Sequence, residues 1–175
     1  MKKPVIIAII VGVIGISAVV LAVVTNQSRN NVSNSSNSSS FIAVDACAVF
    51  TQEIADEHLG GASQKAAAST PTIHSEDLTV SNCIYSKGLD GAALLVRSAK
   101  TTVGAVGNKD QFAGARPDNV ENVDGIGDAA YFEPTTKQLN ILVGNNWYIL
   151  TTYKETLSDT TLDKTLVLTK KLTLL

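Results

Sequence analysis

Residues that usually carry enzyme chemistry are scarce in this sequence. Its 175 residues include only two histidines and two cysteines. A G-x-S-x-G nucleophile motif and a phosphate-binding P-loop are both absent, and so are the ligand spacings of zinc sites. We therefore expect no metal, no cofactor and no catalytic set, and hence a protein that is not an enzyme.

Clusters of positive charge are also missing. Residues 41–175 hold 11 Lys and Arg against 16 Asp and Glu, a net charge of about −5 (11 − 16). No basic patch alternates with aromatic residues, which is the usual sequence signature of nucleic-acid binding. Nucleic acid is therefore excluded as an expected partner.

Between positions 4 and 24 there is no charged residue at all, and Lys2 and Lys3 precede this apolar run. A helix of about 20 residues is enough to cross a bilayer. A cleaved secretory signal is the alternative, with Val20-Leu21-Ala22 as its cleavage site. No cysteine closes the run, which excludes lipidation there. We expect residues 1–24 to be an uncleaved signal anchor that attaches the protein to the membrane through residues 4–24.

The rest of the chain is expected outside the cell. The positive-inside rule places the two lysines in the cytoplasm, which makes this a single-pass protein of the cell membrane. Residues 25–40 are almost wholly Ser and Asn and should form a flexible tether. Residues 41–175 have the length of one domain, which would then be extracytoplasmic.

The strongest fold signal lies between positions 123 and 153. Residues 138–143 alternate in polarity and residues 147–153 are rich in aromatic and β-branched types, so both are expected to be strands. Gly144 and Asn145 between them suit a hairpin turn. A third strand is expected around 126–132, before Pro134. Gly125 and Gly127 predict a turn or bulge at its start. A phosphate loop is excluded because no helix follows to receive the anion.

Shorter signals place the remaining elements. Asp45 and Thr51 suit the caps of two helices, the second ending at Gly60. Residues 64–77 are polar and contain Pro71, and we expect a loop there. Strands at 78–86 and 92–99 follow, joined by a turn at 87–91. Residues 101–115 contain several glycines and are expected to form an irregular helix.

The C-terminal region completes the pattern. Residues 159–173 carry Leu162, Leu166 and Leu172 and favour a helix capped by Ser158 or Asp159, with a strand as the alternative. The order of elements predicts an α+β fold: a single antiparallel sheet of about five strands with helices packed on one face, preceded by an N-terminal transmembrane helix.

Cys47 and Cys83 are expected outside the membrane, where disulfides persist. A bridge would join the first helix to the first strand and close a loop of about 37 residues, which stabilises a domain by roughly 3–4 kcal/mol. A reactive thiol pair is the alternative, but redox motifs usually place their cysteines two residues apart. The sequence therefore predicts a structural disulfide.

Several short motifs follow one another in a recognisable order. They are Asp45-x-Cys47, Phe50-Thr51-x-Glu53-Ile54-Ala55 with Leu59-Gly60, Cys83-x-Tyr85, and Ile126-Gly127-Asp128-Ala129-Ala130-Tyr131. This order resembles the DUF3558-type domains of bacterial envelope proteins and lipoproteins, over roughly residues 43–175. The resemblance implies an envelope-located domain and no agreed activity. Many members carry a lipobox cysteine, where this chain has the apolar run.

The histidines are weak candidates for a site. His58 falls on the apolar side of its helix and is expected to be structural. His74, Ser75, Glu76 and Asp77 gather potential ligands of a cation. Neighbours in sequence seldom all face one ion, so no metal site is predicted.

The aromatic residues of the last strand are the better candidates. Trp147, Tyr148 and Tyr153 form a candidate binding patch on the sheet, and burial of at least one face in the core is the alternative.

Three functions remain open. The first is a membrane-anchored extracytoplasmic domain that binds an envelope protein or a small ligand without catalysis. The second is a cell-envelope hydrolase that uses an acidic residue such as Asp124 or Asp128, near the glycine-rich turn of Gly125 to Asp128. The third is a purely structural or sensory domain, although the short cytoplasmic end argues against direct signalling. We expect the first.

Overall fold

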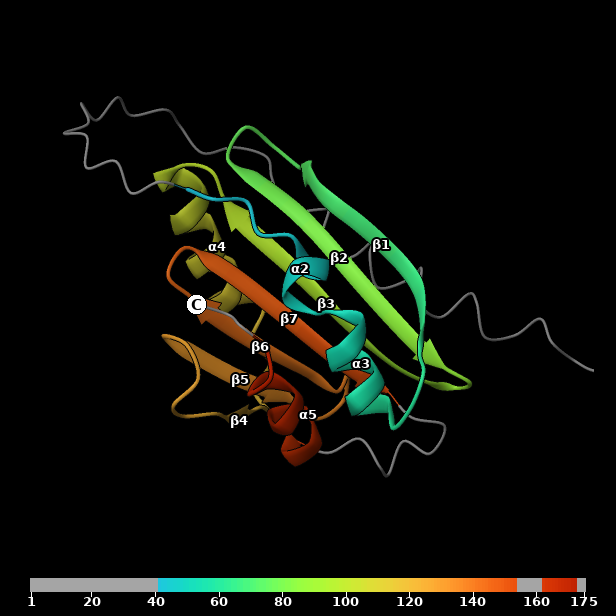
Figure 1. Ribbon diagram of the computed structural model, residues 1–175. Coiled ribbons are helices and arrows are strands. Elements are labelled where there is room, and N and C mark those ends of the chain that lie inside the picture. The colour runs from blue at the N-terminus through green and yellow to red at the C-terminus, as the bar shows by residue number, and fades with distance from the viewer. Residues whose placement is uncertain (1–40, 154–161, 173–175) are drawn as a thin grey trace, which may run out of the picture. The chain divides into compact units, whose positions relative to one another are not determined.

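The computed structural model describes residues 41–153 and 162–172, and its centre is one antiparallel sheet with helices on both faces (Figure 1). The α+β class and the single antiparallel sheet are therefore confirmed. Within the described residues the sheet has seven strands in the order β1-β2-β3-β7-β6-β5-β4. The strands are β1 (Gln64–Ile73), β2 (Leu78–Lys87), β3 (Asp90–Ala99), β4 (Glu121–Asn122), β5 (Ala129–Glu133), β6 (Gln138–Val143) and β7 (Asn146–Tyr153).

The helices cover both faces of the sheet. We call the side that carries α2 (Ala46–Val49), α3 (Gln52–Leu59) and α5 (Leu162–Thr169) the front face, and it is turned to the viewer in Figure 1. The opposite, back face carries α4 (Thr102–Gly114). The prediction that all helices pack on one face was wrong. The central strands place large apolar side chains on the back as well, and these need a cover of their own.

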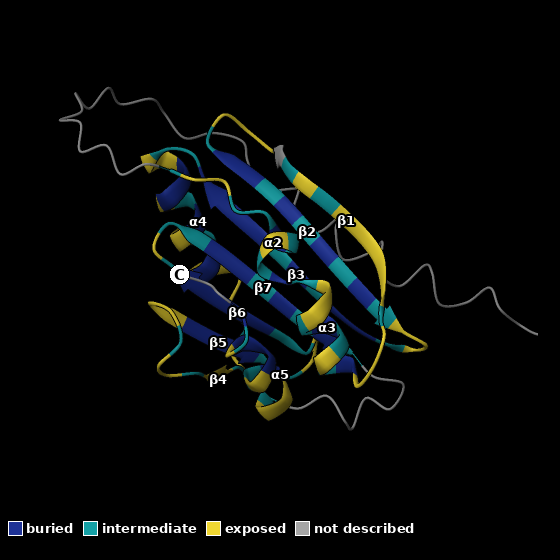
Figure 2. Ribbon diagram, in the orientation of Figure 1, coloured by how far each residue is buried: buried dark blue, intermediate teal, exposed yellow. Residues whose placement is uncertain are grey.

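Alternation along the strands separates a front core from a back core, and Leu78, Ala99 and Ala105 form a third, small cluster. The front core unites the helices with the sheet, while the smaller back core lies under α4. The burial pattern in Figure 2 shows this packing, with β3 and β7 largely buried and β1 mostly exposed. Front-core residues include Phe50, Tyr85, Leu94, Leu139, Leu150 and Leu168, and the buried back core consists of Phe112, Tyr131, Leu142 and Trp147.

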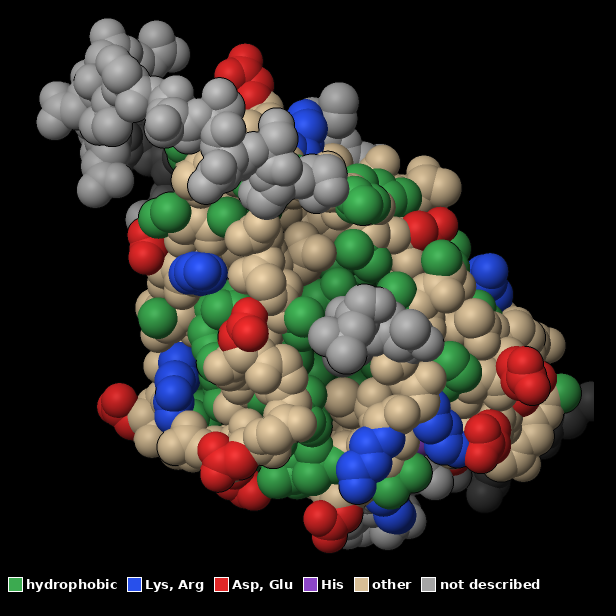
Figure 3. All heavy atoms as spheres, turned by 60° about the vertical axis from the view of Figure 1, so that its left-hand side comes forward, with side chains coloured by type: hydrophobic (Ala, Val, Ile, Leu, Met, Phe, Trp, Pro, Cys, Tyr) green, Lys and Arg blue, Asp and Glu red, His purple; other side chains and the backbone are tan. Residues whose placement is uncertain are grey.

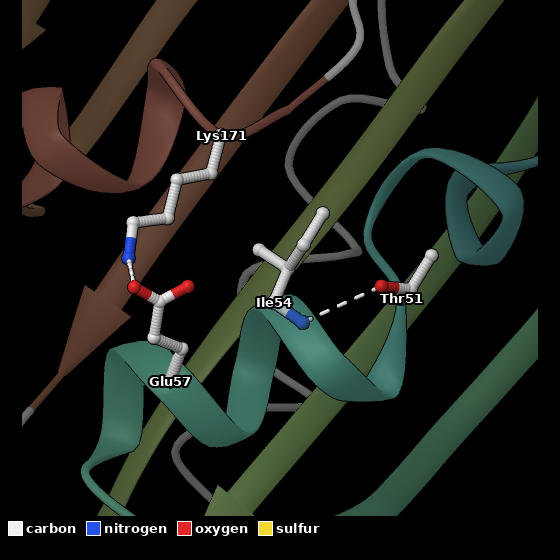
Figure 4. Close-up of polar contacts among 4 residues, drawn as sticks. All are labelled: Thr51, Ile54, Glu57 and Lys171. Carbon is white, nitrogen blue, oxygen red and sulfur yellow. Dashed lines mark hydrogen bonds and ion pairs between the residues drawn. The ribbon is translucent and has the colours of Figure 1, made fainter.

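The predicted helix caps are present. Asp45 Oδ1 accepts a hydrogen bond from the Cys47 amide at 2.9 Å, and Thr51 Oγ1 accepts one from the Ile54 amide at 3.4 Å (Figure 4). Gly60 ends α3 with a φ of 71°, a conformation that favours glycine. Lys171, just after α5, forms an ion pair with Glu57 of α3 (Figure 4). The end of α5 is thus tied to α3.

The prediction of about five strands was too low, because β1 and β4 were missed. Residues 64–77 were expected to be a loop, yet β1 occupies most of them and pairs with β2. The register shifts between Ser69 and Thr72, so Pro71 falls where the ladder is interrupted and its missing N–H is tolerated. β1 is an edge strand with mostly exposed side chains, so it lacks the alternation that marks a half-buried strand. β4 has only two residues.

The glycines of α4 do not make it irregular. Thr101 caps the helix by accepting a hydrogen bond from the Gly104 amide at 3.1 Å. A Cβ on Gly104 would lie 2.1 Å from the Asp77 carbonyl oxygen, so glycine lets the helix approach the chain before β2. The helix α5 is also confirmed over the strand alternative. Its predicted caps, Ser158 and Asp159, lie outside the described residues.

The predicted anchor and tether, residues 1–24 and 25–40, lie outside the described residues as well. Within the described part of the chain, no helix is long and apolar enough to span a membrane.

Candidate functional site

The back face of the sheet is only partly covered by α4. The strand register places Arg97, Trp147 and Leu142 side by side across β3, β7 and β6. α4 packs over this row, and its Phe112 ring lies 6.2 Å from the Trp147 ring, centroid to centroid. On the same face, the residues of β3 before Arg97 and the residues of β7 after Trp147 are less buried than Arg97 and Trp147.

Those rows form a surface that we call the back strip. Leu95 pairs with Ile149, and Ala93 lies between Ile84 and Thr151. Tyr153 closes the far end, where its ring lies across Gly91; a Cβ on that glycine would meet the ring at 2.1 Å. All six side chains of the strip are half-buried: Ile84, Ala93, Leu95, Ile149, Thr151 and Tyr153.

Arg97 stands at the boundary between the back core and the back strip. Its guanidinium carbon lies 5.1 Å from the centre of the Trp147 ring, and Nη1 donates a hydrogen bond to Gln111 Oε1 of α4. The residue is only 6% exposed. Burial lowers the pKa of the Arg97 guanidinium, but an arginine pKa starts so high that the group stays charged at neutral pH.

No carboxylate compensates this charge in the described part of the chain. The ion pair between Lys171 and Glu57 lies on the front face, away from Arg97. The partners of Arg97 are a neutral amide oxygen and a ring face. Figure 3 shows acidic and basic side chains interspersed over the side it presents, so the exposed charges do not gather into one patch there.

Asn108 fixes α4 above this site. Its Nδ2 donates to the carbonyl oxygens of Arg97, at 3.1 Å, and Asn145, at 2.8 Å. The side chain is fully buried, and its Oδ1 has no donor within residues 41–153 and 162–172. Asn108 lies one helical turn before Gln111. The Asn108 oxygen, which has no donor, and the Arg97 guanidinium, which has no carboxylate partner, therefore both lie between α4 and the sheet.

The structure does not bring the three predicted aromatic residues together. Trp147 and Tyr153 lie on the back face, with Trp147 buried under α4 and Tyr153 half-exposed on the back strip. Tyr148 points to the front and belongs to the front core. Burial raises the pKa of both Tyr148 and Tyr153. Of the predicted patch, only Tyr153 offers an accessible surface.

The acidic residues of the glycine-rich turn are exposed and differ in their contacts. Asp128 Oδ2 accepts a hydrogen bond of 2.6 Å from the Gly144 amide, and its own amide donates to the Leu142 carbonyl at 2.8 Å. Asp128 thereby holds the turn against the β6–β7 hairpin. Asp124 makes no hydrogen bond or ion pair with another described residue.

The histidines lie apart from the back strip. His58 is half-buried on α3, and His74 is exposed after β1. Ser75 Oγ accepts from the amides of Asp77 and Leu78, and the Asp77 carboxylate accepts from the Thr101 hydroxyl. Among the residues described, no three His, Cys, Asp or Glu side chains are grouped as a metal site would need.

The cysteine pair is oxidised. Cys47 of α2 and Cys83 of β2 form a disulfide with a Cα–Cα distance of 5.1 Å. Cys83 is fully buried in the front core, so the bridge fastens α2 to the sheet.

Sequence reasoning missed Arg97. The signal was a single arginine inside the otherwise uncharged run Ala92 to Ala99, which forms a central strand. A charged residue is rarely buried in such a strand without a partner, so a lone arginine there indicates a candidate functional residue.

Comparison of the chain with protein-family models, with curated proteins and with solved structures finds no match.

Proposed function

We propose that this protein is a membrane-anchored domain on the outer side of a bacterial cell membrane, and that it acts without catalysis by binding a ligand or an envelope partner on the back face of its sheet. The observation that carries this proposal is the half-exposed back strip beside an uncompensated arginine. A sheet face of this kind, largely apolar with a few polar groups at its margin, has the composition of a binding site.

Two further observations support the location. The disulfide between Cys47 and Cys83 is of the kind that persists in oxidising compartments. The apolar run of residues 4–24 and the order of motifs that resembles DUF3558-type envelope domains favour the same side of the membrane.

Site-specific photo-cross-linking in intact cells tests the proposal. A benzophenone amino acid replaces Ala93 on the back strip of the full-length chain, and the matched control carries it at Val167 of α5, which is 54% exposed on the other side of the sheet. We expect a discrete adduct from position 93 that position 167 does not give.

Adducts of equal yield from both positions, or none from position 93, would contradict binding on the back face. Protease treatment of the same intact cells tests the location, because an outer domain is digested while cytoplasmic markers survive.

A further inference from the structure

Arg97 carries a buried positive charge that has no carboxylate partner among the described residues. Moving a cation into an apolar site without a partner is costly, and buried arginines are normally paired with carboxylates. Arg97 is 6% exposed, yet within the described residues it has only the Gln111 amide oxygen and the Trp147 ring. An anion that the described residues do not supply would complete the site.

Only one nitrogen of the Arg97 guanidinium donates a hydrogen bond to a described residue. Only two buried side-chain polar atoms lack hydrogen bonds in the described residues, Thr79 Oγ1 and Asn108 Oδ1. Nε and Nη2 of Arg97 have no hydrogen bond with a described residue, and neither is among these two buried atoms. Two donor nitrogens of the guanidinium are therefore left for an oxyanion.

The surroundings define the class of ligand. A single positive charge is balanced by a monoanion, and the fork of an arginine matches the two oxygens of a carboxylate. Leu95 and Ala93 lie two and four residues before Arg97 on the same face of β3, at about 7 and 14 Å for a rise of about 3.4 Å per residue. These positions are half-buried and apolar, and Ile149 flanks them.

We propose that the back face binds a small amphipathic carboxylate, with its carboxylate on Arg97 and its apolar chain along Leu95, Ile149 and Ala93. This inference rests on the proposed function and names the chemistry of its ligand. The ligand is a free acid of medium chain length, held by charge at one end and by apolar contact along the strip.

The chain supplies its own reporter for this site. Trp147 is the only tryptophan of the sequence, and the Arg97 guanidinium lies over its ring. Intrinsic fluorescence of the full-length protein in zwitterionic lipid nanodiscs is therefore titrated with octanoate. Octanol provides the same chain without the charge, acetate the charge without the chain, and inorganic phosphate a different oxyanion. We expect a saturable change with octanoate at concentrations at least tenfold lower than with any of the three.

Substitutions test separately the charged part of the site, at Arg97, and its apolar part, at Leu95. Arg97→Gln should weaken octanoate binding about tenfold or more, since a charged hydrogen bond is lost. Arg116→Gln is the matched control, because that guanidinium also stacks on a ring, 5.6 Å from the centre of Tyr131, but is exposed and bonded to Asn122. It should leave the octanoate affinity unchanged.

If circular dichroism shows that Arg97→Gln does not fold, Leu95→Asp is the second variant in which octanoate binding is measured. This change places a carboxylate on the half-exposed strip and should abolish octanoate binding.

Three results would overturn the inference: no saturable fluorescence change with octanoate, equal binding of octanol or phosphate, or an unchanged affinity in every folded variant of Arg97 and Leu95. Such a result leaves the proposed function testable by itself, because cross-linking at position 93 in cells does not depend on the identity of the ligand.

Discussion

At Gly127 the backbone adopts a φ of 61°, and a Cβ there would lie 2.4 Å from the carbonyl oxygen of Leu142. The side chain is excluded both by the left-handed conformation and by a backbone atom that has little freedom to move. Gly125 also has a positive φ, 76°, but has no atom within 4 Å of an added Cβ. A side chain at Gly125 would meet only the cost of the left-handed backbone conformation. A side chain at Gly127 would meet that cost and a steric overlap as well.

Gly127→Ala should accordingly lower the free energy of unfolding by about 3 kcal/mol, against about 1 kcal/mol for Gly125→Ala, which adds only the left-handed penalty. Chemical denaturation of the two variants measures the difference. Equal losses would show that the approach of the turn to β6 has no energetic consequence.

Asp128 is the second residue of this turn with a defined role. Asp128→Ala removes the acceptor of the Gly144 amide and should lower the free energy of unfolding by about 0.5–1 kcal/mol. Asp124→Ala, which loses no such bond, should change it little. If Asp128 were instead a hydrolytic residue, the unchanged protein would hydrolyse isolated cell wall and Asp128→Asn would not. The purified proteins used for the unfolding measurements can be assayed for this hydrolysis.

Individual residues of the fold were predictable wherever their role is local. The caps Asp45 and Thr51 and the turn at Gly144 each depend on neighbours within a few positions. Arg97 was not predictable as a site residue, because its burial depends on how the following helix, α4, folds back over the sheet.

At the scale of elements, the disulfide adds a covalent link to the contacts that the short α2 makes with the sheet. This helix has four residues and depends on its connection to β2. Cys47→Ala combined with Cys83→Ala should lower the free energy of unfolding by about 3–4 kcal/mol. Thermal unfolding with and without a reducing agent checks this, since reduction should destabilise the unchanged protein and leave the double variant unaffected. A protein indifferent to reduction would contradict the role of the bridge.

The end of α3 is held by a carboxylate that makes the element sensitive to acid. Hydrogen bonds from the Ser63 amide, the Ser63 hydroxyl and Gln52 hold the pKa of Asp56 below its ordinary value of 3.8. The folded pKa is the lower one, so this stabilisation is present above pH 3.8 and is lost as the pH falls through the folded pKa.

Asp56→Asn should therefore flatten the loss of thermal stability below about pH 4. Ser63→Ala, which removes one of the three bonds, should flatten it partly. Melting curves between neutral pH and about pH 3 measure this effect, and an Asp56→Asn variant that loses stability as steeply as the unchanged protein would refute it.

Elements were predictable in proportion to the regularity of their burial. β2, β3, β6 and β7 alternate or run apolar, and all four were found from the sequence. β1 is exposed along most of its length and contains Pro71, so neither periodicity nor composition marked it. The face that α4 covers was not predictable either, because the side on which a helix packs is a property of the assembled sheet.

At the scale of the whole domain, the two faces of the sheet are used differently. Among the described residues, three helices cover the front, whereas α4 on the back covers the row of Arg97 and Trp147 and leaves the back strip half-exposed. The front face is thus used for packing, and part of the back face is the surface on which we propose that a ligand binds. The central claim is that this open part carries a small acid in its native setting.

Native mass spectrometry of the full-length protein, released from its own membranes in non-ionic detergent without reduction, tests this claim most directly. We expect the mass of the oxidised chain, two hydrogens below the reduced one, together with a discrete addition of a few hundred daltons or less that is absent from Arg97→Gln. A bare oxidised chain in both proteins, or the same addition on both, would contradict it.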